Sequence, residues 1–217
     1  MDRIKALAAA LPAHADGYLI TSESNIFYFT GFPCDAALLL VTREDSFFFT
    51  DSRYLEAAQS VIGGVTFCNT AQFAKEFPAL CERYGVRRLL VETAAMTVRE
   101  AQKYSALLPQ TEFLYEDDLA FLSAFRRKKS ADEVQKMTRA QRIAEAALET
   151  VLPTIRPGRT EKEIALDLDY TMLRMGADAL SFQTIVVSGA NSSLPHGVPG
   201  SRQVRDGRWF FHDFRYK

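Results

Sequence analysis

The sequence predicts an α/β protein in two parts, a mixed sheet with flanking helices followed by a smaller α+β segment. Up to about residue 125, short β-rich runs alternate with helical patterns, and the runs are apolar on both faces, as in a sheet covered by helices. Beyond this point the order becomes helix, helix, strand, long polar loop and strand. We therefore expect one domain over residues 1–125 and a second over residues 126–217.

In the first part, the hairpin-like spacing of the early runs favours a mixed sheet over a purely parallel one. The predicted strands cover residues 17–21, 25–32, 36–41, 46–51, 65–68, 87–92 and 112–116. Helical patterns cover residues 53–61, 71–85 and 97–108. Asp51 precedes the first of these helices, and we expect its side chain to cap it.

The boundary between the parts is marked by "RRKKSADE". Residues 126–129 are all basic, which fits a solvated linker better than a binding patch. Ser130 and Glu133 have the Ser-x-x-Glu spacing of a capping box, which predicts a helix from Ala131.

The second part begins with two predicted helices. The first has apolar residues at helical spacing over about five turns and ends before "PTIRPGRT", whose prolines and glycine break it. Thr160 and Glu163 form a second capping box, and Gly176 closes the helix that follows. The apolar residues of the first helix are Val134, Met137, Ala140, Ala144, Ala147, Leu148 and Val151, and those of the second are Ile164, Leu168, Met172 and Met175.

Composition and charge give no support for several classes of protein. The formal net charge is -1, so there is no electrostatic basis for binding nucleic acid or an anionic membrane. No apolar run reaches the length of a membrane span, and the N-terminus does not resemble a signal peptide, so we expect a cytoplasmic protein. Cys34, Cys68 and Cys81 are far apart and odd in number, which predicts buried free thiols.

The last forty residues hold the candidate chemistry. A predicted strand at 181–189 leads into a polar, glycine-containing loop that offers Asn191, Ser192, Ser193 and His196. By pattern alone, this loop is either a reactive loop on a rigid frame or a solvent-exposed connection.

The predicted closing strand at 208–214 has an acidic residue, Asp213, near its C-terminal end. Alternation puts Asp213 on one face with Trp209 and Phe211, and puts His212 on the other face, so Asp213 and His212 are not expected to grip one metal ion together. A carboxylate on an aromatic face needs a cation, a hydrogen-bond partner or solvent at the strand end. The residues alone leave these alternatives open.

Several motifs in order resemble the proline-specific metallopeptidases, aminopeptidase P and Xaa-Pro dipeptidase, of the creatinase-like pita-bread superfamily. In the second part they are "RRKKSADEVQKM", "RPGRTEKEIA" and "SFQTIVVSGANSSLPHGVPGSRQVRDG", followed by an apolar strand and "DF". In the first part they are "NIFYFTGF" and "TDSRYLEAA". The resemblance covers essentially the whole chain. It implies a creatinase-type N-terminal domain followed by an incomplete α+β pita-bread catalytic domain.

The resemblance also implies a chemistry. Members of this family hydrolyse the peptide bond before proline with two divalent metal ions, for which manganese, cobalt or zinc would be suitable, held by two aspartates, a histidine and two glutamates. Asp213 matches the first metal ligand. His196 matches the histidine that lies beside the substrate and stabilises charge on the attacked carbonyl. The family further implies proline-containing peptides as substrates and a homodimer built through the N-terminal domain.

The chain departs from the family at its end. Arg215 stands where the family has glycine, and the remaining ligands would lie beyond Lys217. We therefore expect a chain truncated within the catalytic domain, for instance by a frameshift or premature stop, and inactive by itself. The alternatives are a non-catalytic binding or dimerisation module and a pseudogene remnant.

Overall fold

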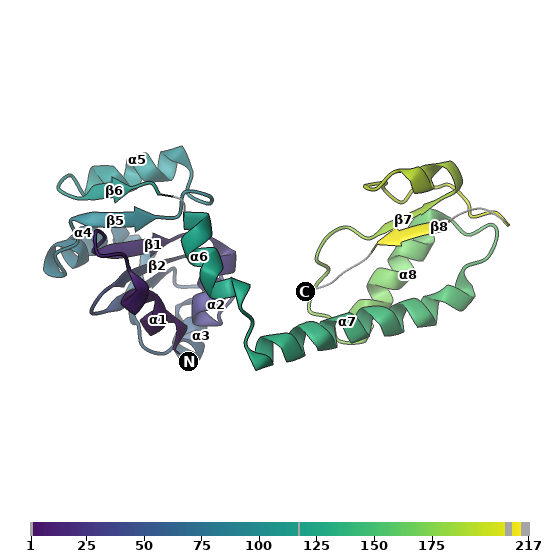
Figure 1. Cartoon of the computed structure of the whole chain (residues 1–217), viewed down its shortest axis with the longest axis horizontal. Coiled ribbons are helices and arrows are strands. Elements are labelled where there is room, and N and C mark those ends of the chain that lie inside the picture. Colours follow the sequence, from purple (N-terminus) through teal and green to yellow (C-terminus); the bar gives the residue numbers. More distant parts are fainter. Residues whose placement is uncertain (1, 117, 207–209, 214–217) are drawn as a thin grey trace. The chain divides into compact units, whose positions relative to one another are not determined.

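A computed structural model describes residues 2–116, 118–206 and 210–213 of the chain. The chain divides into two compact units, Met1–Lys128 and Lys129–Lys217, which are described separately (Figure 1). No helix in the described ranges is both long enough and apolar enough to cross a membrane.

The first unit is built on a six-stranded mixed sheet with the strand order β4-β3-β2-β1-β5-β6. Only β2 runs against the others, because it is antiparallel to both β1 and β3 while the remaining neighbours are parallel. This confirms the predicted mixed sheet. The strands are β1 (Gly17–Ile20), β2 (Ala37–Thr42), β3 (Ser46–Thr50), β4 (Thr66–Asn69), β5 (Arg88–Val91) and β6 (Glu112–Leu114).

Helices cover both faces of this sheet (Figure 1). One core contains Tyr18 and Phe48 from the strands, and the other contains their neighbours Leu19 and Phe49, because successive strand residues point to opposite faces. The first core receives side chains from α1 (Arg3–Ala10), α2 (Glu23–Thr30), α3 (Leu55–Val61) and α6 (Asp118–Arg127). The second receives them from α4 (Phe73–Arg83), which follows the short η1 (Thr70–Gln72), and from α5 (Val98–Leu107).

The strand predicted at residues 25–32 is wrong, because this segment lies largely in helix α2. Ser22 caps the helix by accepting a hydrogen bond from the Asn25 amide, and Gly31 ends it in the left-handed conformation at φ 74°. The run of β-branched and aromatic residues suggested a strand, but Ile26 and Phe29 are buried at helical spacing. Tertiary packing and capping therefore override local propensity here.

A buried carboxylate fixes the start of α2. Glu92, directly after β5, is 3% exposed, and its Oε2 accepts hydrogen bonds from the amides of Thr21 (2.9 Å) and Ser22 (2.8 Å). Its Oε1 accepts from the Ser22 hydroxyl at 2.5 Å and from the Asn25 side-chain amide. A negative charge is favourable at this helix end because the amide dipoles point toward it.

The predicted cap on α3 is also wrong. The helix begins at Leu55 without any side-chain cap hydrogen bond. The Asp51 carboxylate instead accepts from the backbone amide and the guanidinium of Arg53, and that guanidinium holds the pKa of Asp51 below its ordinary value. The aspartate side chain therefore shapes the turn before the helix, since it bonds to Arg53, which precedes the first helical residue.

The second unit contains α7 (Ala131–Val151), η2 (Leu152–Thr154), α8 (Glu161–Arg174), β7 (Ile185–Ser188), η3 (Gly189–Ser193) and β8 (Phe210–Asp213). Both predicted capping boxes are confirmed, at Ser130 with Glu133 and at Thr160 with Glu163. Gly176 lies in the left-handed conformation just after α8, as expected for a helix stop.

The core of this unit lies between α7, α8 and β7. The predicted stripe on α7 is buried only in its C-terminal half, around Ala144, Ala147 and Val151, whereas Val134 and Met137 are more than half exposed. On α8, the predicted residues Ile164, Leu168 and Met172 are buried, but Met175 is exposed at the helix end.

Helix α8 is tied to the start of β7 by Asp169, whose carboxylate accepts a hydrogen bond from the buried hydroxyl of Thr184. Burial raises the pKa of Asp169 above its ordinary value of 3.8, and the hydrogen bond opposes this rise. The folded state therefore binds the Asp169 proton more tightly than the unfolded state does.

Replacing Glu92 should destabilise the first unit. We expect Glu92→Ala to lower its free energy of unfolding by about 2–4 kcal/mol, because four donors lose their acceptor in a buried place. Glu23→Ala, at an exposed position in the first turn of the same helix, should cost less than about 0.5 kcal/mol. Hydrogen exchange of the β1 and β5 amides would measure both. Equal losses would contradict a specific role for the buried carboxylate.

Replacing Asp169 should alter the pH dependence of the second unit. The stabilisation from its raised pKa is complete below a pH of about 3.8 and is lost as the pH rises through the folded pKa. Asp169→Asn keeps an acceptor for Thr184 without the charge, so its stability relative to wild type should improve between about pH 4 and about pH 7. Urea unfolding at both pH values measures this. Asp178→Asn, at an exposed position, serves as the matched control for the chemical change itself.

Candidate functional site

The candidate site is built on β7, β8 and the long connection between them. The strands are antiparallel, with Ser188 opposite Phe210 at one end and Ile185 opposite Asp213 at the other. The connection leaves β7 and returns to β8 at the end of the sheet where Ser188 lies. The Asp213 backbone lies three residue pairs away from this end, which is about 10 Å at the usual rise per strand residue. The sequence predicted which face of β8 each of its side chains occupies. These side chains lie outside the part of the chain whose side chains the structure describes.

The loop after β7 contains the four polar residues singled out in the sequence. The hydroxyl of Ser192 donates to the Gly189 carbonyl, and that of Ser193 donates to the Ala190 carbonyl at 3.0 Å, so both hydroxyls support the turn η3 itself. Asn191 is half-buried, and its carbonyl accepts from the Leu194 amide at 2.9 Å. These three residues shape the loop.

His196 has an exposed side chain, but the backbone beside it is held in place. The Gly197 amide donates to the Leu194 carbonyl at 3.1 Å, and Gly197 is buried against β7. A Cβ atom on Gly197 would lie 2.7 Å from Val187 Cγ1, so only glycine fits without a shift of its neighbours. The imidazole therefore projects from a backbone that is packed against the strand.

The sequence interpretation missed Glu161, the first residue of α8. Its side chain is 0% exposed. Oε1 accepts from the amide (2.7 Å) and the hydroxyl (2.9 Å) of Ser188, and Oε2 accepts from the Gly200 amide at 3.3 Å. A signal was available, because Glu161 shares the apolar stripe of Ile164 and Leu168 at spacings of three and seven residues. A carboxylate on an apolar stripe predicts a buried, hydrogen-bonded acid.

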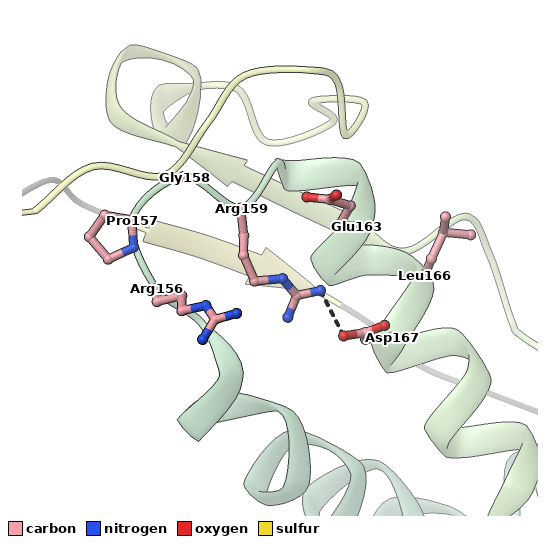
Figure 2. Close-up of a pocket in the computed structure, with 7 residues that line it drawn as sticks. All are labelled: Arg156, Pro157, Gly158, Arg159, Glu163, Leu166 and Asp167. Carbon is pink, nitrogen blue, oxygen red and sulfur yellow. Dashed lines mark hydrogen bonds and ion pairs between the residues drawn. The ribbon is translucent and has the colours of Figure 1, made fainter.

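A second feature of this unit is an open pocket of about 560 Å³ around the turn before α8 (Figure 2). Arg159 donates to Asp167 at 2.7 Å and to the Thr154 hydroxyl at 2.8 Å. The Glu163 carboxylate accepts from the amide and hydroxyl of Thr160, which lowers its pKa. The lining residues are Arg156, Pro157, Gly158, Arg159, Glu163, Leu166 and Asp167. The lining has no thiol or imidazole, and three of its four charged groups are held by protein partners.

The described residues do not assemble a metal centre. Among the side chains that the structure describes, those of residues 2–116 and 120–206, no three of His, Cys, Asp or Glu gather in a way that could hold a metal ion. His14 pairs with Glu116 at 2.8 Å in the first unit. The carboxylates of Glu92 and Glu161 are each used by several protein donors. A two-metal site therefore does not fit the residues that the structure describes.

Two of the three cysteines are unreactive thiols at neutral pH. All three are free and buried, as predicted. Burial raises the pKa of Cys81 to about 12, and burial together with the neighbouring Glu76 raises that of Cys68 to about 12. Thiols with such values stay protonated at neutral pH, so they are poor nucleophiles and poor metal ligands.

The chain matches two known families in succession. Residues 3–120, more than half of the chain, match the creatinase/prolidase N-terminal domain, and residues 135–217 match metallopeptidase family M24. An uncharacterized peptidase of Bacillus subtilis is 34% identical over 200 residues, which cover 92% of this chain and 56% of the relative.

Solved structures agree with these matches. An Xaa-Pro dipeptidase from Bacillus anthracis is similar with a TM-score of 0.92 and 30% identity, over 100% of this chain and 61% of that one. An X-Pro aminopeptidase from Thermotoga maritima has a TM-score of 0.85 and 28% identity, over 93% of this chain and 59% of that one. The chain thus spans little more than half the length of these relatives. It belongs to the creatinase/prolidase family, with the N-terminal domain of that family followed by a segment of metallopeptidase family M24.

Proposed function

We propose that this chain is the N-terminal portion of a metal-dependent Xaa-Pro peptidase. In this proposal, residues 1–125 are the creatinase-type domain and residues 126–217 begin the metallopeptidase domain. The observation that carries the proposal is the similarity of both units, in the same order, to an Xaa-Pro dipeptidase along the whole chain. The substrates would be peptides with proline after the cleaved bond.

Within this proposal, His196 and Asp213 carry the chemistry that this chain contributes. His196 would contact the substrate beside the cleaved bond, and its exposed imidazole on a packed loop backbone suits that role. Asp213 would supply one metal ligand from the end of β8. Carboxylate and imidazole ligands suit manganese, cobalt and zinc alike, so ligand type does not choose among these metals.

We further propose that the 217 residues alone do not catalyse peptide hydrolysis. A two-metal peptidase site clamps two ions between several ligands, and of the ligands that the family resemblance implies only Asp213 lies in this sequence. A more complete domain would be needed to assemble the site.

A peptidase assay tests the inactivity directly. The purified 217-residue chain, supplied with manganese, cobalt or zinc, should release no more product from an Xaa-Pro dipeptide or a longer Xaa-Pro peptide than the metal alone does. The Xaa-Pro dipeptidase of Bacillus anthracis serves as the positive control. Metal-dependent turnover by the pure chain would overturn the proposed inactivity.

A chimera tests the proposed roles of His196 and Asp213. Residues 1–213 would be joined to the part of the Bacillus anthracis dipeptidase that follows the aligned region, which should give metal-dependent cleavage. We expect Asp213→Asn to abolish metal binding and activity, and His196→Gln to lower kcat by about 100-fold while metal binding persists. A folded chimera whose metal binding is unaffected by Asp213→Asn would contradict the proposed ligand.

We also propose that the chain forms a homodimer through residues 1–125, as the family resemblance implies. Sedimentation velocity over about a hundredfold range of protein concentration should then show a shift from monomer to dimer. Removing divalent metal with a chelator should leave the shift unchanged, because the contact would not involve the metal site. A monomer at every concentration would exclude the dimer.

A further inference from the structure

Glu161 is a fully buried carboxylate that forms no ion pair with any described residue. Its three hydrogen bonds all come from two points of the chain, Ser188 at the end of β7 and Gly200 twelve residues later. These two points are the ends of the loop that carries His196. One side chain therefore closes the loop at its base.

We infer that Glu161 is the positioning residue for His196, acting by clamping both ends of the loop from 189 to 200. The inference rests on the proposed function, because it gives the loop its role beside the substrate. A carboxylate suits the clamp, since both of its oxygens are acceptors and all three groups facing it are donors. Its place in the first turn of α8 adds stabilisation from the amide dipoles of the helix.

Backbone contacts extend the clamp on the side of the returning chain. The Glu161 amide donates to the Arg202 carbonyl at 3.0 Å, and the Lys162 amide donates to the Gly200 carbonyl at 3.1 Å. The Val204 amide donates to the Arg159 carbonyl at 2.8 Å. The start of α8 is thus joined to the chain that leaves the loop by its backbone as well as by the Glu161 carboxylate.

Packing supports the same arrangement from within the loop. A Cβ on Gly189, the first residue of the loop, would lie 2.7 Å from Nη2 of Arg202. Arg202 comes two residues after the loop ends at Gly200, so the side chain of the returning segment packs against the start of the loop. Gly197 is equally close to Val187 of β7. The loop is therefore held at its two ends and next to His196, and only the clamp at the ends depends on a charged side chain.

Graded variants separate a clamp from a general contribution to stability. In Glu161→Gln, the amide oxygen can still accept from Ser188, but the amide nitrogen, a donor, faces the Gly200 amide. This variant should therefore lose the hydrogen bond to Gly200 and keep those to Ser188. Glu161→Ala should free both ends, and Ser188→Ala should remove only the hydroxyl bond. The matched control is Glu163→Gln, also in the first turn of α8. Among the described residues, the Glu163 carboxylate accepts hydrogen bonds only from Thr160.

Hydrogen exchange measured amide by amide on the full chain tests the clamp. We expect Glu161→Gln to speed exchange at Gly200 by about tenfold or more and to leave Ser188 within about twofold. Glu161→Ala should speed both, while the α7 amides change by less than about twofold. Glu163→Gln should affect only the first turn of α8. If Glu161→Gln sped hydrogen exchange equally at all amides of the second unit, the inference would be overturned.

The imidazole of His196 gives a second, spectroscopic readout. The chain has three histidines, so the His196 ring proton signal is assigned by its loss in His196→Gln. In Glu161→Ala the signal should narrow toward that of a freely moving side chain, and in Glu163→Gln it should not change. An unchanged His196 ring signal in Glu161→Ala would overturn the inference. If Glu161→Ala unfolds, the same signal is compared in Glu161→Gln and Ser188→Ala instead.

Neither readout needs a metal ion or a substrate. If the loop loosens as expected but the chimera never cleaves a peptide, the clamp stands and the proposed function fails. If the chimera is active, and neither amide exchange in the loop nor the His196 signal changes in the Glu161 variants, the clamp fails and the proposed function stands.

Discussion

The carboxylate of Glu161 is the contact on which the candidate site depends. It lies at the start of α8, is closed off from solvent, and holds the strand end and the returning chain at one point. Asp169, two turns further along the same helix, holds the residue before β7. A single helix therefore fixes the strand at both ends with acidic side chains. A buried acid without a cation is costly, so its donors must remain in place for the unit to stay folded.

The first unit uses the same physical device for a different purpose. Glu92 fills the N-terminus of α2, at the carboxyl end of a parallel strand. In many α/β proteins this position receives a ligand, because free helix amides there favour an anion. Here the protein supplies its own carboxylate, and the aromatic cores occupy both faces of the sheet. The unit is thus organised for packing, and the chemistry proposed for the chain lies in the second unit.

The second unit presents His196 on a fixed frame but does not gather metal ligands among its described residues. The chain covers 61% of the Bacillus anthracis dipeptidase that it resembles throughout. Under the proposed function, this unit would contribute the rigid loop and the histidine, and ligands from outside the 217 residues would complete the metal site. Half-exposed apolar residues on α7, such as Val134 and Met137, show that this unit leaves part of its apolar surface uncovered.

The sequence by itself determined the elements whose signals are local. Capping boxes marked the starts of α7 and α8, and segments with proline or glycine marked their ends. The hairpin-like spacing of the early apolar runs indicated the mixed sheet. Motifs that the chain shares with proline peptidases indicated the family, which the matches over residues 3–120 and 135–217 established. Only the tertiary structure decided that residues 23–30 form a helix and that Glu92 and Glu161 are buried clamps. The apolar stripe of α8 contains a local signal that Glu161 is buried, but it does not specify which groups donate to the carboxylate. The donors to Glu92 and Glu161 lie about 70 residues and 27 to 39 residues away along the chain, so no local pattern specifies these donors.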